Sequence, residues 1–174
     1  KGIQTLELPI RKDYRTVTLN VCPTHSSKSR LTGKGHQKEL DKYYQEIEQV
    51  LSEIPATESL LVFTFKEIKA AVEEHFKKGK YYGRVKVAHW GGGHKATNRF
   101  SEIKYIFTLG VLRRNRADLT ANLLGAKDSL FSTVSNFEIQ AIEHTEMADM
   151  LVQAFGRGYN RKTHNGVAGE TTIY

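Results

Sequence analysis

Two arginines near the end of the sequence carry its clearest chemistry. Residues 153–161 read QAFGRGYNR and follow an apolar stripe with helical spacing, so that Arg157 and Arg161 come just after a helix. Arginine keeps its charge and offers a planar set of donors, so it suits a transferring phosphoryl group better than lysine does. The alternative is a helix end whose arginines only complement the helix macrodipole.

Two further segments have residues suited to phosphate contacts. Residues 91–100 read GGGHKATNRF; glycines let a backbone approach phosphates closely, and Thr97 or Asn98 can cap a helix whose free N–H groups attract phosphate oxygens. Thr64 and Lys66 stand at the end of an apolar run. The alternative for the glycine segment is a tight turn between strands.

The sequence contains no phosphate-binding loop of its own. Hydrolysis of a nucleoside triphosphate needs a phosphate cradle with its lysine and a carboxylate for Mg²⁺. The fragments at 33–34 and 93–95 lack the spacing of that loop. His89 and His94 flank the glycines, but no third ligand follows at a recognisable spacing, so a metal site is not expected.

The arginine segment resembles motif VI of superfamily 2 helicases of the DEAD/DEAH type. The resemblance implies that Arg157 is the arginine finger, that Arg161 is the second arginine facing phosphate, and that Gln153 and Gly156 belong to the nucleotide-binding motif. One departure is that three residues, rather than two, separate the arginines. The role of Arg161 is therefore less firmly implied than that of Arg157.

The other two segments resemble further motifs of the same family. Residues 91–100 are similar to motif V, which implies nucleic-acid contacts by Gly93, Thr97 and Asn98, and Thr64 and Lys66 occupy the place of motif IV. The resemblance implies a C-terminal RecA-like domain whose ATP and Mg²⁺ are held mainly by an N-terminal RecA-like domain of the same parent chain. The other partner would be DNA or RNA, and this chain alone should not hydrolyse ATP.

Hydrophobic patterns predict an α/β domain with a mostly parallel sheet. A RecA-like domain is expected over residues 37–174, after a lead-in strand and basic loop over residues 1–36. The loop is predicted at residues 26–36. Residues 137–144 suit either a strand or a helix, and we favour a strand, with Thr145 capping the helix after it. Strands are predicted at 16–21, 60–65, 85–89, 105–109 and 171–174, and helices at 38–54, 68–76, 116–124 and 145–155.

Composition narrows the class of protein. A net charge of +7 favours polyanionic partners, and no apolar run approaches the ~20 residues that span a bilayer. The single cysteine, Cys22, suits a reducing compartment, so a cytoplasmic protein is expected. The sequence opens on Lys1 and is expected to be a piece of a longer chain. Two rival functions stay open: a non-catalytic nucleic-acid-binding module, and a stand-alone enzyme that uses His89 or His94 as a base.

Overall fold

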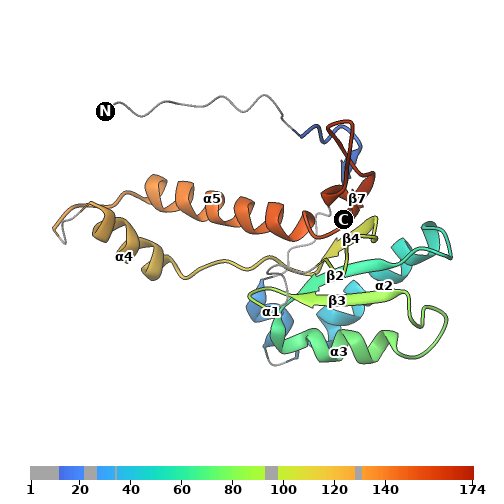
Figure 1. Cartoon of the computed structure of the whole chain (residues 1–174). Helices are drawn as coiled ribbons and strands as arrows, with labels where there is room; N and C mark the ends of the chain where they lie inside the picture. The colour runs from blue at the N-terminus through green and yellow to red at the C-terminus, as the bar shows by residue number, and fades with distance from the viewer. Residues whose placement is uncertain (1–11, 22–26, 34, 93–97, 128–130) are drawn as a thin grey trace.

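A five-stranded sheet forms the centre of the molecule. The computed structural model describes residues 12–21, 27–33, 35–92, 98–127 and 131–174. Strand order is β1-β7-β4-β2-β3, and every neighbouring pair is parallel (Figure 1). The predicted α/β class with a parallel sheet is confirmed. The strands are β1 (Val17–Leu19), β2 (Leu60–Thr64), β3 (Val85–His89), β4 (Tyr105–Thr108) and β7 (Thr171–Ile173).

Helices connect the strands, and a small antiparallel hairpin precedes the last one. The predicted helices starting near residues 38, 68 and 116 are confirmed as α2, α3 and α4. The bounds are α1 (Lys28–Thr32), α2 (Gln37–Glu53), α3 (Lys66–Phe76), α4 (Arg116–Ala126), α5 (Asn136–Phe155), a 3-10 helix (Tyr159–Arg161), β5 (Thr163–His164) and β6 (Val167–Ala168).

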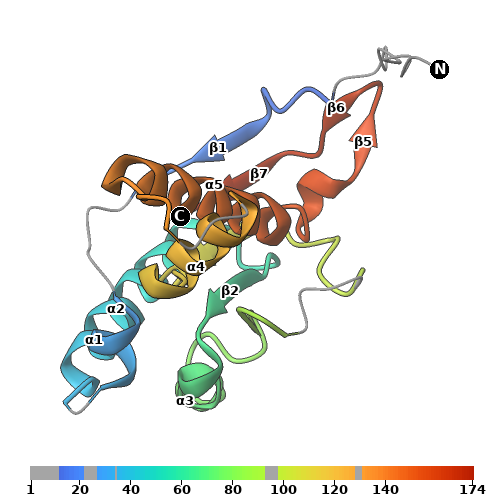
Figure 2. The same ribbon diagram turned by 90° about the vertical axis from the view of Figure 1, so that its left-hand side faces the viewer.

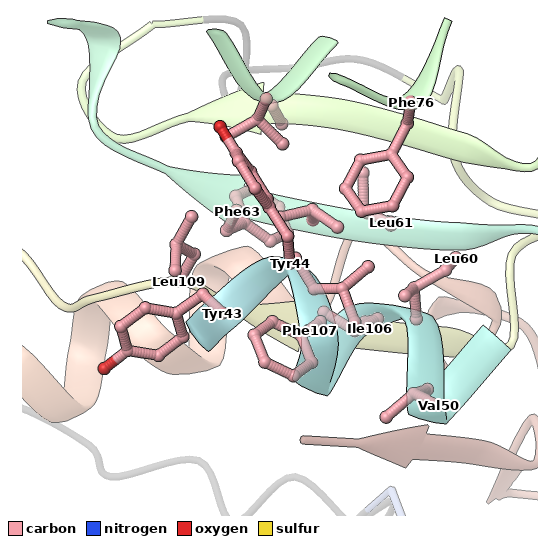
Figure 3. Close-up of a cluster of buried hydrophobic side chains, with 14 of the residues drawn as sticks. Tyr43, Tyr44, Val50, Leu60, Leu61, Phe63, Phe76, Ile106, Phe107 and Leu109 are labelled. Carbon is pink, nitrogen blue, oxygen red and sulfur yellow. The ribbon is translucent and has the colours of Figure 1, made fainter. Parts of the chain in front are cut away.

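The core is built around β2. Its five residues are all buried, as expected for a continuous apolar strand covered on both faces of a parallel sheet. Side chains of β4 and α2, among them Ile106, Phe107 and Tyr44, pack into the same cluster as Phe63 (Figure 3). The ring of Tyr44 also stacks on His75 of α3 at 3.8 Å, which joins the two helices.

Two sequence predictions are wrong. Residues 137–144 form no strand, because α5 is one helix from residue 136 to 155, and Thr145 lies inside it. Its start is fixed by a capping box in which the Ser135 hydroxyl accepts from the backbone of Glu138 while the Glu138 carboxylate accepts from the backbone of Ser135. The predicted loop at 26–36 contains α1, because Ser27 caps a helical turn and Leu31 is fully buried.

The ends of the described chain meet in the sheet, while one helical pair leaves it. β1 pairs with β7 from Val17 opposite Thr171, so the lead-in strand is part of the same sheet. Figure 1 shows α4 and α5 as a hairpin that extends away from the strands. Figure 2 shows α1, α2 and α3 gathered at the opposite end from β1, β5 and β6. Within the described ranges, no helix has the length and apolar character needed to cross a bilayer.

Candidate nucleotide-facing and nucleic-acid-facing sites

The residues singled out from the sequence lie at opposite edges of the sheet. Thr64 pairs with His89 where β2 and β3 end, which is the carboxyl edge. The backbone N–H of Tyr159 donates to the carbonyl of Ile103, just before β4 begins, at 2.8 Å, which places the arginine segment at the amino edge. A five-residue strand rises roughly 15 Å, so the two groups of residues are separated by about that distance.

The arginine segment is packed tightly against the amino edge of β4. Gly158 is buried, and a Cβ there would lie 2.8 Å from Ile106 Cδ1 and 2.9 Å from the carbonyl oxygen of Ile103. These contacts leave no room for a side chain, so glycine is required at this approach. The backbone between Arg157 and Arg161 is thereby held in a fixed position.

The Tyr159 ring anchors the same segment between two lysines. Lys104 Nζ lies 5.6 Å and Lys162 Nζ 5.2 Å from the ring centroid, within the range of cation–π attraction. Lys162 also pairs with Glu102 at 2.6 Å. The hydrogen bond from Lys162 lowers the pKa of Glu102. The ring therefore holds cationic side chains at this edge of the sheet.

Arg157 has an unsatisfied donor beside this edge. Its side chain is half-buried, and the Nε atom is buried with no hydrogen-bond partner among the described residues. The amide oxygen of Asn160, which is 4% exposed, is likewise without a partner there. Buried donors are nearly always paired in folded proteins, so this unpaired N–H is unusual.

Arg161 is exposed, and hydrogen bonds hold both its side chain and its backbone. Its Nη1 donates to the Oδ1 of Asn98, and its backbone carbonyl accepts from Lys12 Nζ at 3.1 Å. Burial, and after it the positive charge of Arg161, lowers the pKa of Lys12. The amino edge thus gathers several cations, which suits a polyanionic ligand.

The other predicted nucleotide-motif residues have plain surroundings. Gln153 is exposed on α5 and its side-chain amide donates to Asp149 at 2.8 Å. Gly156 ends α5 and its N–H donates to the carbonyl of Val152 at 2.9 Å. In the described part of the chain, no group of three or more histidine, cysteine or carboxylate side chains is placed to hold a metal ion.

The predicted nucleic-acid-binding residues are split. Lys66 opens α3 and is exposed at the carboxyl edge, whereas Thr64 is fully buried there and its hydroxyl does not reach the surface. Asn98 lies at the amino edge with Arg161, so the structure joins one residue of each motif. Gly93 and Thr97 lie outside the described residues.

Several residues of the amino edge were not identified from the sequence. Lys12 and Lys104 belong to no motif, and only the fold brings them to the arginine segment, whereas Lys162 directly follows Arg161 in sequence. Tyr159 stands between the two arginines in sequence, but one of its two anchoring contacts comes from Lys104, about 55 positions away. The repeated basic residues around 157–162 are the only local signal for this cluster.

No family model, curated protein or solved structure matches this chain. The functional argument therefore starts from the two edges of the sheet. The amino edge offers guanidinium groups on a rigid backbone, which can bind phosphate oxygens and stabilise negative charge that develops on them. The carboxyl edge offers the exposed cation Lys66, which can bind a phosphate backbone.

Proposed function

We propose that this chain is the C-terminal RecA-like motor domain of an ATP-dependent nucleic-acid helicase or translocase of superfamily 2. Three features support the proposal: the parallel sheet, the order of the three motif-like segments, and the arginines presented at one edge of that sheet. The nucleotide would lie between this edge and an N-terminal RecA-like domain of the same parent protein.

The observation that carries the proposal is the state of Arg157. Its backbone is fixed by the buried Gly158, and its Nε donor is buried without a partner in the described structure. Because that Nε is shielded, the other N–H groups of the half-buried guanidinium would be the ones to meet an anion. A guanidinium held in place costs little reorganisation when an anion binds, which is the property that transition-state stabilisation needs. An arginine that merely complements a helix end would instead be expected to be solvated.

Each residue of the amino edge has a proposed role. ATP would supply the phosphoryl group that is transferred, and Arg157 would donate hydrogen bonds to the oxygens over which its negative charge is spread. Arg161 adds a second cation, and its hydrogen bond to Asn98 orients its side chain. To bind a ligand, the guanidinium would break this hydrogen bond or use its other N–H groups. Gln153 and Gly156 complete the motif.

The track would be DNA or RNA. Lys66, at the exposed start of α3, is the predicted contact that the geometry supports best, because its ammonium group is open to a backbone phosphate. Roles for Gly93, Thr97 and Asn98 stay predictions from the motif, and the burial of Thr64 does not support a direct side-chain contact. Closure of the nucleotide cleft would then shift the track contacts on this domain relative to those on the other one.

The first test is nucleic-acid-stimulated ATP hydrolysis by the full parent protein with Arg157→Ala. Turnover should fall about 10³-fold or more while ATP binding is retained, since arginine fingers contribute on that scale. The matched control is Arg116→Ala, which removes an exposed arginine from α4 that pairs only loosely, at 3.8 Å, with Glu143. The control should keep its turnover.

Two outcomes would count against the motor function. Unchanged turnover in Arg157→Ala would remove that residue from the chemistry. Absence of any stimulated hydrolysis in the natural protein would favour the rival function, a non-catalytic nucleic-acid-binding module.

A further inference from the structure

A groove of about 670 Å³ lies between α3 and the outer strand β3. β3 stands at the edge of the sheet, and among the described strands it pairs only with β2. Apart from the isolated bridge between His89 and Gly92, no other described strand pairs with the side of β3 that faces away from β2. None of the residues that form the amino-edge arginine cluster lines it.

The groove is cationic. Four of its described lining side chains carry positive charge, and Glu73 is the one carboxylate among them. Glu73 pairs with Lys69 at 2.7 Å, and Lys77 pairs at 3.5 Å with Glu74, which does not line the groove. Four cations against one carboxylate give the lining a positive formal charge. The positively charged residues are Lys69, Lys77, Lys86 and Arg99.

Aromatic groups accompany these charges. Tyr82 lines the groove with 72% of its surface exposed, so its ring face is accessible to a planar ligand. The guanidinium of Arg99 lies 5.6 Å from the ring centroid of the buried Phe100, so this cation lies against an apolar ring. Cations together with an accessible aromatic ring are the combination by which proteins bind single-stranded nucleic acid.

The position of the groove agrees with such a ligand. His89 and Gly92 line the groove where β3 ends, and His89 pairs with Thr64 in register. Lys66 begins α3 two residues after Thr64, so the groove runs toward the carboxyl edge at which the proposed track contact lies. A lysine on an edge strand can also serve only to discourage pairing with other chains, and Lys86 alone would fit that explanation. Protection of an edge strand does not require four cations and an exposed tyrosine, so it does not account for the whole lining.

We propose that this groove binds the phosphate backbone of single-stranded nucleic acid and leads the strand along β3 to the carboxyl edge. The inference rests on the proposed function for the identity of the track, but it involves neither ATP nor Arg157. Lys86 and Arg99 contact backbone phosphates, and Tyr82 stacks on a base.

The test is a fluorescence-anisotropy titration of a labelled oligothymidine with this chain at several salt concentrations. The variant Lys86→Gln/Arg99→Gln should weaken binding about tenfold, and the slope of log K against log salt should become about 1.4 less negative, because two phosphate contacts are lost. Tyr82→Ala should weaken binding about fivefold or more while the slope stays unchanged, because stacking releases no counterions.

The matched control is Lys38→Gln/Lys42→Gln, which removes the same charge from exposed positions of α2 outside the groove. This control should bind the oligonucleotide within about twofold of the natural chain, since it keeps the phosphate contacts. Circular dichroism and thermal unfolding of all three variants check that each is folded.

Three results would overturn the inference. Equal weakening in the groove variant and the α2 control would mean that only total charge matters. Unchanged binding in the groove variant would place the strand elsewhere. A labelled polyglutamate peptide is titrated in the same way. If the groove variant lost binding to this peptide while it kept its binding to the oligonucleotide, the groove would be assigned to an acidic polypeptide. A failure of the ATP-driven motor function is separate, because it would appear in the Arg157→Ala hydrolysis assay and leave this titration unaffected.

Discussion

The strand β2 and the α4–α5 hairpin are stabilised in different ways. All five residues of β2 are buried, whereas α4 and α5 together bury only Leu119, Ile139 and Ala154. Phe137 and Val152 on α5 are 78% and 65% exposed. The sheet is thus held by removal of apolar surface from water, and the hairpin receives little of that stabilisation.

Polar contacts hold the hairpin instead. Ion pairs join Arg114 to Glu146 at 2.7 Å and Lys127 to Glu138 at 2.6 Å, and Ser135 caps α5. Exposed ion pairs contribute little individually, so the hairpin should open more easily than the sheet. The difference shows that one domain can contain an element stabilised mainly by apolar burial and another stabilised mainly by polar contacts.

The largest expected effect is in the sheet. Phe63→Ala should lower the free energy of unfolding by about 3–5 kcal/mol, because Phe63 is fully buried against Trp90 and its removal leaves a cavity. The matched change on the hairpin, Val152→Ala, should stay within about 0.5 kcal/mol. Urea unfolding followed by circular dichroism measures both. Similar losses in the two variants would contradict the difference between the regions.

A pair of glycines gives an intermediate test. Gly158→Ala should lower the unfolding free energy by about 1–3 kcal/mol, because the added Cβ meets Ile106 and the carbonyl of Ile103. Gly125→Ala, inside α4 with no atom within 4 Å of the added Cβ, should raise the stability of that helix by about 0.5–1 kcal/mol. Thermal unfolding of the two variants should move in opposite directions. Unchanged or raised stability in Gly158→Ala would show that the arginine segment is less tightly packed than described.

The smallest effect concerns pH. The hydrogen bonds of Glu138 with Lys127 and then with Ser135 lower the pKa of its carboxyl from 4.5 to about 2. A lowered pKa means that its contribution is fully present above pH 4.5 and is lost as the pH falls toward 2. Amide hydrogen exchange in the first turn of α5, corrected for intrinsic rates, should accelerate across that range. In Glu138→Gln the exchange should already be faster at pH 7, and it should change little between pH 4.5 and pH 2.

Much of the sheet was predictable because burial leaves a local pattern. The continuous apolar run at β2 and the stripe of α2 each identify an element directly, and both are confirmed. The helix predicted at 145–155 is confirmed as the second part of α5, but a strand is predicted for its first part, because a helix that buries only Ile139 and Ala154 has no strong apolar face. The capping pair Ser135 and Glu138 was the signal that could have identified its start.

The candidate sites were predictable only in part. Arg157 and Arg161 stand together in sequence, so their motif could be recognised, but no local pattern shows which edge of the sheet they occupy. That position depends on the approach of Gly158 to Ile103, a contact over more than 50 residues. The groove beside β3 could not be predicted either, because Lys69, Lys86 and Arg99 come from three separate segments.

The placement of β7 between β1 and β4 also dictates the order in which the domain can assemble. β2, β3 and β4 pair over short sequence separations, while Val17 must find Thr171 across nearly the whole described chain. Strands that are distant in sequence pair slowly, because the conformational entropy of the long intervening loop is lost before the contacts between them can stabilise the pair. On the ribosome, β1 would wait unpaired until β7 had been synthesised, and the arginine segment just before β7 would reach its final position only in this last step.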